Sequence, residues 1–404
     1  MHDPAEHPSG QPPPIRDTRS QAVGSRVLLA VEATPAVLLP LLRQAWEGGP
    51  AVLPLDPRLP PRARGALVQA FKPGAILKPG GLVQLPGGTP VADDVMAVVA
   101  TSGSTGTPKG VELTREALES SVALGLAASR SDPSVPWVCC LPVSHVAGLL
   151  VLLRGVVTGT PALLMDDFDP AAIVALEGPV HLAIVPTMLT RLIQAGADPS
   201  RWHTVLVGGA RIPAGLRQAV PGLTTTYGMT ETSGGCVYDG QPLPGVRVEE
   251  GADGRLRIGG PTLMSGYRMA AETGVDPDGM LTTNDIGEVT ADGTVRVLGR
   301  ADDVIVTGGE KVVAAAVATR LEEHPAVAQA EVIGIPDSEW GQRAVAVVVP
   351  AQVGAILSLA LLREFVAESM PRYAAPQDLM VVNMLPRLSN GKVDRFALTR
   401  AILD

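Results

Sequence analysis

The sequence has few lysines, few cysteines and no long uninterrupted apolar run. Lysine occurs only at positions 72, 78, 109, 311 and 392, although the chain carries 32 basic residues, so arginine is the usual cation. A lysine kept in such a chain indicates a position that needs a compact ammonium group, because a planar guanidinium does not replace a point donor. This argument applies to Lys109 and Lys392, whereas Lys72 and Lys78 lie among prolines and glycines.

These scarcities exclude several classes of protein. Three cysteines, two of them adjacent, are too few for a disulfide framework and predict a reducing, cytoplasmic environment. The apolar region Val146 to Met165 is interrupted by Arg154, Gly155, Gly159 and Pro161, which argues against a membrane span. A net charge of −9 argues against a nucleic-acid partner. Residues 1–22 are polar and proline-rich without the pattern of a signal peptide, so we expect a disordered tail.

Short β-branched runs alternate with helical segments, which predicts an α/β fold. The strands are expected at Val95–Ala100, Trp137–Leu141, His181–Val185 and Thr204–Val207. From Val246 to Val297 turn signals between short strands indicate a smaller antiparallel or β-barrel-like unit. The last hundred or so residues form a further α+β pattern, with helices near 312–323 and 357–369 and strands near 330–335, 344–349 and 379–382.

The segment Thr101 to Gly110, TSGSTGTPKG, follows the first of these strands and predicts a polyphosphate-binding loop. Glycines allow backbone N–H groups to turn toward one anion, and hydroxyls and a lysine add donors and charge. A Walker P-loop does not fit, because Pro108 precedes the lysine and Gly110 stands where the magnesium-binding hydroxyl belongs. A flexible linker is the remaining alternative. The candidate donors are Thr101, Ser102, Gly103, Ser104, Thr105, Gly106 and Lys109.

Five further motifs follow in order: VGGAR at 207–211, TTYGMTET at 225–232, TNDIGEV at 283–289, GRADDVIVTGGEKV at 299–312 and LSNGKVDR at 388–395. Together with the glycine-rich loop they resemble the adenylate-forming superfamily of acyl-CoA synthetases, luciferases and peptide-synthetase adenylation domains, over roughly residues 95 to 400. The resemblance implies ATP-dependent activation of a carboxylic acid as an acyl adenylate, followed by transfer to a thiol, usually that of coenzyme A. It also implies a large α/β adenylation domain at 23–299, a hinge at 300–303 and a small mobile C-terminal domain at 304–404.

The resemblance assigns roles around the nucleotide. Tyr227 would stack on adenine, Thr230 would donate to the α-phosphate, and Glu231 would bind Mg²⁺, which prefers hard oxygen ligands. Asp285 would hold the ribose hydroxyls, although Asn284 departs from the glycine usual in the family. The other nucleotide-binding positions that it implies are Gly208, Gly209, Ala210, Gly228 and Arg300. Taken alone, Gly208, Gly209, Ala210 and Asp285 would suit ordinary turns, and Glu231 would suit an exposed carboxylate at a helix start.

The C-terminal motifs imply a second set of roles. Asp302 matches the hinge residue, and Lys392 would bridge the attacking carboxylate and the α-phosphate in the first half-reaction only. Gly308, Gly309 and Lys311 would line the coenzyme A tunnel after the C-terminal domain rotates. Considered alone, Lys392 would be an ordinary solvated lysine.

The segments SHVAGL and YGMTETSGGCVYDGQPLPGV most closely resemble the o-succinylbenzoate:CoA ligases of menaquinone biosynthesis, and the short N-terminal region agrees with them. Their substrate is a dicarboxylate, whose second carboxylate needs a receptor. His145, Arg154 and Ser233 are candidates, and Gly234 would leave room for the aromatic ring. An arginine in an apolar run either reaches solvent or meets an anion.

The leading hypothesis is therefore a cytoplasmic o-succinylbenzoate:CoA ligase using ATP, Mg²⁺ and coenzyme A. The alternatives are a ligase for another aryl or short acyl acid, an adenylation domain that loads a carrier protein, and a non-catalytic nucleotide-binding relative. The expected partners are small molecules, and the sequence leaves a homodimer open.

Overall fold

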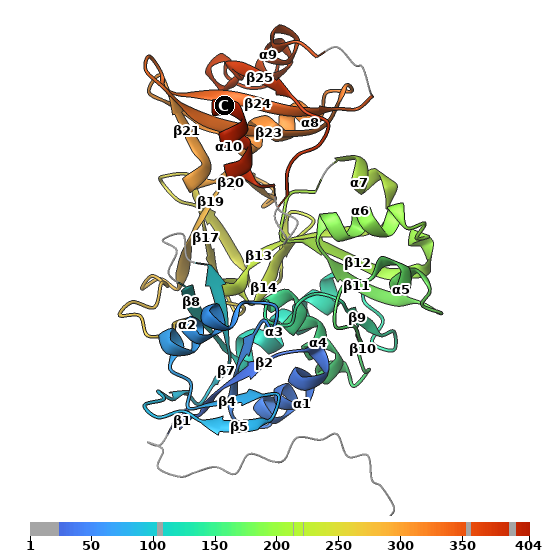
Figure 1. Cartoon of the computed structure of the whole chain (residues 1–404), viewed down its shortest axis with the longest axis vertical. Coiled ribbons are helices and arrows are strands. Elements are labelled where there is room, and N and C mark those ends of the chain that lie inside the picture. The colour runs from blue at the N-terminus through green and yellow to red at the C-terminus, as the bar shows by residue number, and fades with distance from the viewer. Residues whose placement is uncertain (1–23, 103–107, 213, 221, 353–356, 388–392) are drawn as a thin grey trace, which may run out of the picture.

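The computed structural model describes residues 24–102, 108–212, 214–220, 222–352, 357–387 and 393–404 (Figure 1). The predicted tail at 1–22 lies outside these residues. Helices and strands alternate through most of the described chain, which confirms the predicted α/β class. Among the described residues, no helix has both the length and the apolar composition that a membrane crossing requires.

The N-terminal part is built on a seven-stranded sheet of order β18-β8-β7-β3-β2-β4-β5. Its central strands are parallel, whereas β7 and β8 form an antiparallel hairpin. A small two-stranded sheet, β1 (Ser25–Arg26) with β6 (Val91–Ala92), lies outside it. The strands of the large sheet are β18 (Gly266–Tyr267), β8 (Pro108–Thr114), β7 (Val95–Ser102), β3 (Ala51–Leu55), β2 (Leu28–Glu32), β4 (Ala75–Lys78) and β5 (Gly81–Gln84).

A second seven-stranded sheet has the order β10-β9-β11-β12-β13-β14-β15. The strands from β10 to β13 are parallel, so their carboxyl ends meet at one edge, where open α/β sheets bind ligands. The strands are β10 (Leu163–Leu164), β9 (Trp137–Cys139), β11 (Val180–Ile184), β12 (Trp202–Gly208), β13 (Leu223–Met229), β14 (Gly234–Tyr238) and β15 (Gln241–Pro242).

Helices fill the space between these sheets and cover their outer faces (Figure 1). The helix α4 (Val146–Thr158) is apolar apart from Arg154 and Thr158 and is mostly buried, which its Val-, Leu- and Gly-rich composition requires. Helices α1 (Pro35–Trp46), α3 (Arg115–Ala128) and α4 (Val146–Thr158) share the core between the sheets. The outer helices are α2 (Pro61–Phe71) on the first sheet and α5 (Pro170–Val174), α6 (Pro186–Gln194) and α7 (Ala214–Ala219) on the second.

A four-stranded antiparallel sheet follows, as the turn signals predicted. The structure shows an antiparallel sheet in this region, and β16 and β20 are its two outermost strands among the described residues. Its strands are β16 (Arg247–Glu250), β17 (Arg255–Gly259), β19 (Met280–Val289) and β20 (Val295–Arg300). The short 3-10 turns of the chain are η1 (Pro199–Arg201), η2 (Thr230–Thr232), η3 (Ala301–Asp303) and η4 (Arg372–Ala374).

The C-terminal residues form a five-stranded sheet with helices on both faces. The expected helix near residue 312 begins later, because Val312 and Val313 pair with β21 as part of a strand that suits their β-branched side chains. The elements are β21 (Val304–Thr307), β22 (Glu310–Val313), α8 (Ala314–Glu322), β23 (Val327–Asp337), β24 (Gly341–Pro350), α9 (Leu359–Ala367), β25 (Asp378–Val381) and α10 (Arg395–Leu403).

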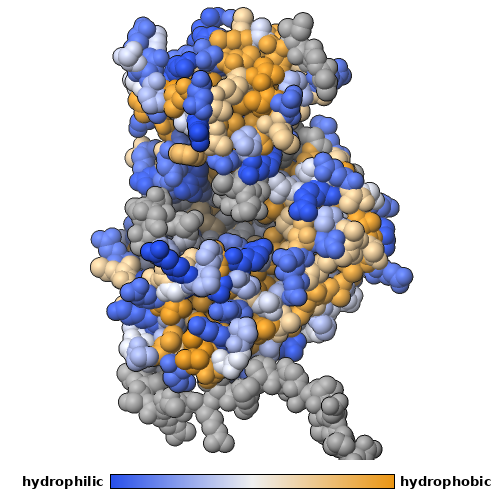
Figure 2. All heavy atoms as spheres, in the orientation of Figure 1, coloured by the Kyte–Doolittle hydropathy of each residue, from blue (hydrophilic) through white to orange (hydrophobic). Residues whose placement is uncertain are grey.

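The buried cores on the two sides of residues 300–304 are separate. Every described member of the three N-terminal clusters precedes Arg300, and every member of the two C-terminal clusters follows Val304. This separation supports the division into two domains that the sequence suggested, which remains a proposal. Figure 2 shows a hollow between the C-terminal part and the rest of the molecule, with hydrophilic residues among those that border it.

Candidate active site

The predicted phosphate-binding loop joins two paired strands and does not open a helix. In the ladder between β7 and β8, Thr101 pairs with Lys109 and Ser102 pairs with Pro108, so the loop begins and ends at the same point of the sheet. The Nζ atom of Lys109 lies 4.8 Å from the centre of the Tyr267 ring, within the range of a cation–π interaction. The predicted positions Gly103, Ser104, Thr105 and Gly106 lie outside the described residues.

Backbone segments approach one another closely near the carboxyl ends of β12 and β13. Gly208 pairs with Thr226, and a Cβ atom at 208 would collide with the Thr226 hydroxyl. Gly209 has a φ of +78°, a conformation that favours glycine, and Ala210 follows it. A Cβ atom at Gly228 would collide with the carbonyl of Gly234. The glycines are therefore required by the turns, whatever ligand the turns accept.

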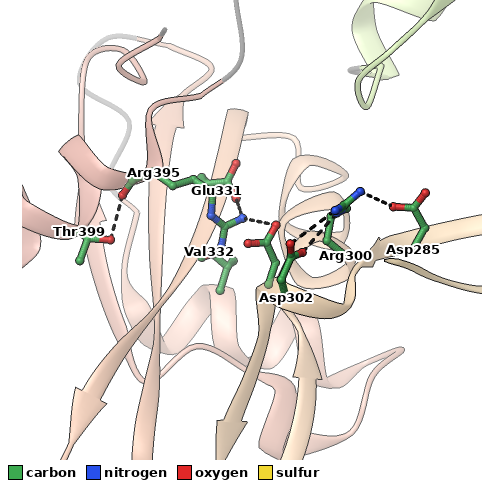
Figure 3. Close-up of polar contacts among 8 residues, drawn as sticks. Asp285, Arg300, Asp302, Glu331, Val332, Arg395 and Thr399 are labelled. Atoms are coloured by element: carbon green, nitrogen blue, oxygen red, sulfur yellow. Dashed lines mark hydrogen bonds and ion pairs between the residues drawn. The ribbon is translucent and has the colours of Figure 1, made fainter. Parts of the chain in front are cut away.

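Tyr227, Asp285 and Arg300 form a connected polar group at the border of the C-terminal domain. The Tyr227 hydroxyl donates to Oδ2 of Asp285 at 2.8 Å, and Nη1 of Arg300 donates to its Oδ1 at 3.3 Å. Arg300 also donates to Asp302, with Nε 3.3 Å from Oδ1 (Figure 3). Asp285 is only 7% exposed, and the hydrogen bonds from Tyr227 and Arg300 hold its buried carboxylate in place.

Burial and charge act together on this group. Burial raises the pKa of Tyr227, and the neighbouring Asp285 charge raises it further, so the phenol remains a hydrogen-bond donor. Burial lowers the pKa of Arg300, but its hydrogen bond to Asp302 and the charge of Asp285 outweigh that effect and leave its pKa raised. The group therefore presents a fixed carboxylate and a permanent cation.

The polar contacts continue into the C-terminal domain. Figure 3 shows Arg395 of α10 beside Glu331 of β23, with Nη1 2.9 Å from Oε1 of the carboxylate. The same nitrogen lies 3.5 Å from Oδ2 of Asp303, next to the predicted hinge residue Asp302. Residues from η3, β23 and α10 thus meet at the predicted domain border.

The 3-10 turn η2 carries Thr230 and Glu231. Its end is fixed by Thr232, whose Oγ1 donates to the Gly234 carbonyl at 2.7 Å and accepts the Met229 N–H at 2.9 Å. Oε1 of Glu231 accepts a hydrogen bond from the Tyr267 hydroxyl at 3.0 Å. Tyr267 therefore touches both the predicted metal ligand and the predicted phosphate-binding lysine.

Of the predicted substrate residues, His145 and Gly234 lie near the first half of α4, whereas Arg154 lies further along the helix. His145 is the N-cap residue of this helix. Ser233 is fully buried with a φ of +49°, and its carbonyl accepts the Ser121 hydroxyl of α3 at 2.7 Å. Gly234 packs so closely on Leu150 of α4 that a Cβ atom would displace it. Gly234 thus lies against the helix that His145 caps, whereas Ser233 is bonded to α3.

Arg154 lies one helical turn beyond Leu150 and is only 4% exposed. Its guanidinium stacks on Trp137, with Cζ 4.3 Å from the ring centre, and interacts with the Tyr238 hydroxyl. Its Nε and Nη1 atoms have no hydrogen-bond partner in the described structure. Burial lowers the pKa of Arg154, partly offset by Tyr238. Of the two alternatives for this arginine, the structure rules out exposure to solvent.

The predicted coenzyme A residues lie in the tight turn between β21 and β22. Gly308 and Gly309 have φ angles of +58° and +85°, and the Gly308 N–H donates to the Trp340 carbonyl at 2.9 Å. A Cβ atom at Gly308 would lie 2.9 Å from the indole ring of Trp340. Lys311 is exposed in β22 and pairs with Val306. This turn packs on Trp340 of its own domain.

The chain is similar in sequence and in fold to known proteins. Residues 84–268 match the AMP-binding enzyme family, and residues 316–392 match the AMP-binding enzyme C-terminal domain. A probable 2-succinylbenzoate–CoA ligase of Mycobacterium tuberculosis is 41% identical over 335 residues, which cover 78% of this chain and 86% of the relative. The chain belongs to the AMP-binding enzyme family. This result confirms the resemblance to adenylate-forming enzymes.

Other members of the AMP-binding enzyme family extend the comparison. A 2-succinylbenzoate–CoA ligase of Bacillus cereus is 33% identical over 349 residues, which cover 77% of this chain and 70% of the relative. The o-succinylbenzoate CoA synthetase MenE of Bacillus subtilis, solved with the acyl-adenylate intermediate OSB-AMP, has a TM-score of 0.75 at 24% identity. That likeness covers 93% of this chain and 88% of MenE and concerns the fold.

The donor set of this AMP-binding enzyme fits Mg²⁺ only together with a nucleotide. Among the described residues, no group of three or more His, Cys, Asp or Glu side chains is arranged to hold a metal. Mg²⁺ in nucleotide sites is usually held by one or two carboxylates, by phosphate oxygens and by water. Glu231, whose Oε1 is fixed by Tyr267, agrees with that pattern.

Sequence reasoning missed three side chains of this region: Tyr267, Tyr238 and Arg211. Tyr267 and Tyr238 belong to a set of only four tyrosines, which is a signal that was available in the composition. Arg211 stood in a recognised motif, but its partner lies 111 residues away. Arg211 and Glu322 come into contact only in the folded structure.

Proposed function

We propose that this AMP-binding enzyme is an ATP-dependent 2-succinylbenzoate–CoA ligase, which forms the acyl adenylate and then the coenzyme A thioester. The buried, incompletely bonded guanidinium of Arg154 carries the substrate assignment. A buried cation needs a counter-charge, and a dicarboxylic acid supplies one at the end opposite its reacting carboxylate. The names of the relatives from M. tuberculosis and B. cereus support the same substrate.

In the first half-reaction, one carboxylate oxygen of the acid attacks the α-phosphorus of ATP and pyrophosphate leaves. The site must cancel charge on the polyphosphate and hold the attack in line. We assign the β- and γ-phosphates to Lys109 and the loop before it, the ribose to Asp285, the adenine to Tyr227 and the 208–210 turn, and the α-phosphate to Thr230. Bound Mg²⁺ would neutralise phosphate charge beside Glu231. Lys392 keeps its proposed role at the attacking carboxylate and lies outside the described residues.

In the second half-reaction, the thiol sulfur of coenzyme A attacks the acyl carbon, the proton of the thiol is lost and AMP leaves. We assign this step to an arrangement in which Gly308, Gly309 and Lys311 line the path of the pantetheine. Gly309 supports this assignment, because nothing lies within 4 Å of the position that its Cβ atom would take and its backbone is open to a ligand, whereas Trp340 fills the same space at Gly308. Rotation about Asp302 would be needed to bring this turn to the adenylate.

The second carboxylate of the acid would be held by Arg154, with Ser233 and His145 nearer the reacting end and Gly234 leaving room for the ring. The fully buried Ser233 hydroxyl has no partner in the described structure, which supports a role in holding the acid. The positions of Arg154 in α4, of His145 at its N-cap and of Gly234 against Leu150 support this assignment.

The test is coenzyme A thioester formation followed by mass spectrometry, with ATP, Mg²⁺ and a panel of 2-succinylbenzoate, benzoate, fatty acids and simple dicarboxylates. We expect 2-succinylbenzoyl-CoA as the preferred product. Preference for benzoate or a fatty acid would contradict the role of Arg154 and favour a ligase for another acid. Acid-dependent ATP–pyrophosphate exchange without thioester would favour carrier-protein loading instead.

A further inference from the structure

One short segment, Met264 to Arg268, contacts both charged parts of the proposed nucleotide site. At one end the Met264 N–H donates to the Glu231 carbonyl at 2.9 Å. At the other end Arg268 donates its N–H to the Gly110 carbonyl at 2.7 Å, and Tyr267 pairs with Val111 of β8. The backbone of this segment therefore fixes the distance between η2 and the end of the phosphate-binding hairpin.

The side chain of Tyr267 makes the same connection through its two ends. Its hydroxyl donates to Oε1 of Glu231 at 3.0 Å, and its ring lies under Nζ of Lys109 at 4.8 Å. The negative face of the ring attracts the ammonium, while the hydroxyl satisfies one oxygen of the carboxylate. Among the described residues the other oxygen of Glu231 has no hydrogen-bond partner, so it can bind a ligand.

The ring is held in one orientation by its surroundings. Gly274, with a φ of +81°, packs against it so closely that a Cβ atom there would lie 2.6 Å from Cε2 of the ring. The tyrosine is therefore a rigid spacer between two opposite charges. Among the described residues, Lys109 makes no ion pair with a carboxylate.

We propose that Tyr267 is a positioning residue that keeps Lys109 and Glu231 apart, so that both charges remain available to the metal–nucleotide. This inference rests on the proposed function. Without the spacer, a lysine and a glutamate in one site would attract each other, and ATP would have to break that ion pair before binding. With it, the ammonium and the carboxylate face the polyphosphate and its Mg²⁺ as separate partners.

The experiment measures ATP binding by calorimetry in the absence of any acid, first with EDTA and then with Mg²⁺. In Y267F the ring remains and the hydroxyl is lost, so we expect metal-free ATP binding within about twofold of wild type. The gain in ATP affinity on adding Mg²⁺ should fall roughly tenfold, the scale of a lost hydrogen bond to a charged group. Y373F, at a tyrosine that is 45% exposed in the C-terminal domain, is the matched control and should behave as wild type.

A second pair of variants separates positioning from a loss of structure. Y267L removes ring and hydroxyl, and we expect metal-free ATP binding to weaken by roughly tenfold because Lys109 then pairs with Glu231. The double variant Y267L/E231Q should recover metal-free binding, since a neutral amide does not compete for the ammonium. A double variant as weak as Y267L would overturn the proposal, as would Y267F with an unchanged response to Mg²⁺.

These outcomes are distinct from a failure of the proposed function. The binding experiment contains no acid, so a different preferred acid would leave its interpretation unchanged. A wild-type protein that binds no ATP with or without Mg²⁺ would instead contradict the proposed function itself.

Discussion

Nη2 of Arg211 lies 3.1 Å from Oε1 of Glu322, across the border between the two proposed domains. The same guanidinium donates to the Thr319 hydroxyl at 3.1 Å and to the Ala330 carbonyl at 3.0 Å. Glu322 also accepts the Ala330 N–H at 3.0 Å, so the carboxylate is held from both sides. The turn that follows Gly208 is thereby tied to α8 and β23 of the C-terminal domain.

Replacing Arg211 should loosen this orientation of the C-terminal domain. In R211A three hydrogen bonds are lost at once, and we expect a larger radius of gyration in solution scattering and faster proteolysis near residues 300–304. R211K should lie between R211A and wild type, because one ammonium does not reproduce the guanidinium fork. R217A is the matched control, since Arg217 pairs with Asp239 within the N-terminal domain. Scattering and proteolysis equal to wild type would show that other contacts set the orientation.

Arg154 should be costly for stability. R154M removes a buried cation of which Nε and Nη1 are unbonded and keeps a similar volume, so we expect the free energy of unfolding to rise by about 1–4 kcal/mol. Use of 2-succinylbenzoate should fall by at least about a hundredfold in kcat/KM, the scale of a lost buried ionic contact. Chemical denaturation and steady-state kinetics measure the two effects.

Arg268 is the matched control for that variant. It is also buried, but it donates to the carbonyls of Phe71, Pro90 and Thr89 and pairs with Glu112. R268M should therefore lower the free energy of unfolding by about 3–5 kcal/mol, because it leaves those groups unpaired. Changes of the same sign in the free energy of unfolding of R154M and R268M would contradict the difference that we draw between the two arginines.

Asp285 should determine how strongly the enzyme prefers ATP to a nucleotide that lacks the 3′-hydroxyl of the ribose. Wild type is expected to bind ATP at least about tenfold more tightly than 3′-deoxy-ATP, whereas D285N should bind both weakly and about equally. The reason is that the amide loses the ion pair with Arg300 and one acceptor oxygen. D302N changes the other partner of Arg300 and should keep the discrimination. A D285N variant that still distinguishes the two nucleotides would assign the ribose to another residue.

His181 should make stability depend on pH. Burial holds its pKa below the ordinary value of 6.5, although its contact with the Asp132 carbonyl opposes that effect. Between the lowered pKa and 6.5 the unfolded chain binds more protons than the native one, so the free energy of unfolding falls as pH decreases through this interval. The slope from this one group is at most about 1.4 kcal/mol per pH unit.

The variant H181F keeps an aromatic ring beside Trp137, whose ring centre lies 4.7 Å from that of His181. Its unfolding free energy should be less dependent on pH between 5 and 6.5 than that of wild type, roughly by that slope. Urea denaturation at several pH values measures the difference. Parallel curves for the two proteins would show that His181 is not the group that titrates.

Much of the fold followed from local sequence. The β-branched runs predicted the strands β7, β11 and β12. The site residues that were predicted belong to turn-forming motifs. The glycines of these motifs are constrained by nearby backbone, so they can be recognised in the sequence.

The contacts that were not predicted depend on packing between distant segments. Ser121 bonds the carbonyl of Ser233 over 112 residues, and Tyr267 bonds Glu231 over 36. Neither pair shares a periodicity or a spacing that marks it. The helix start at Ala314 was missed because Val312 and Val313 suit a strand, and pairing with β21 decided between the two.

The three thiols of the chain are all buried. Burial raises the pKa of Cys139 and of Cys140 to about 12 and that of Cys236 to about 11, so at neutral pH they are protonated and poor nucleophiles. In the proposed reaction an activated acyl group would form within a protein that has its own sulfur atoms. Their seclusion leaves the thiol of the co-substrate without an internal competitor and protects the enzyme from acylating itself.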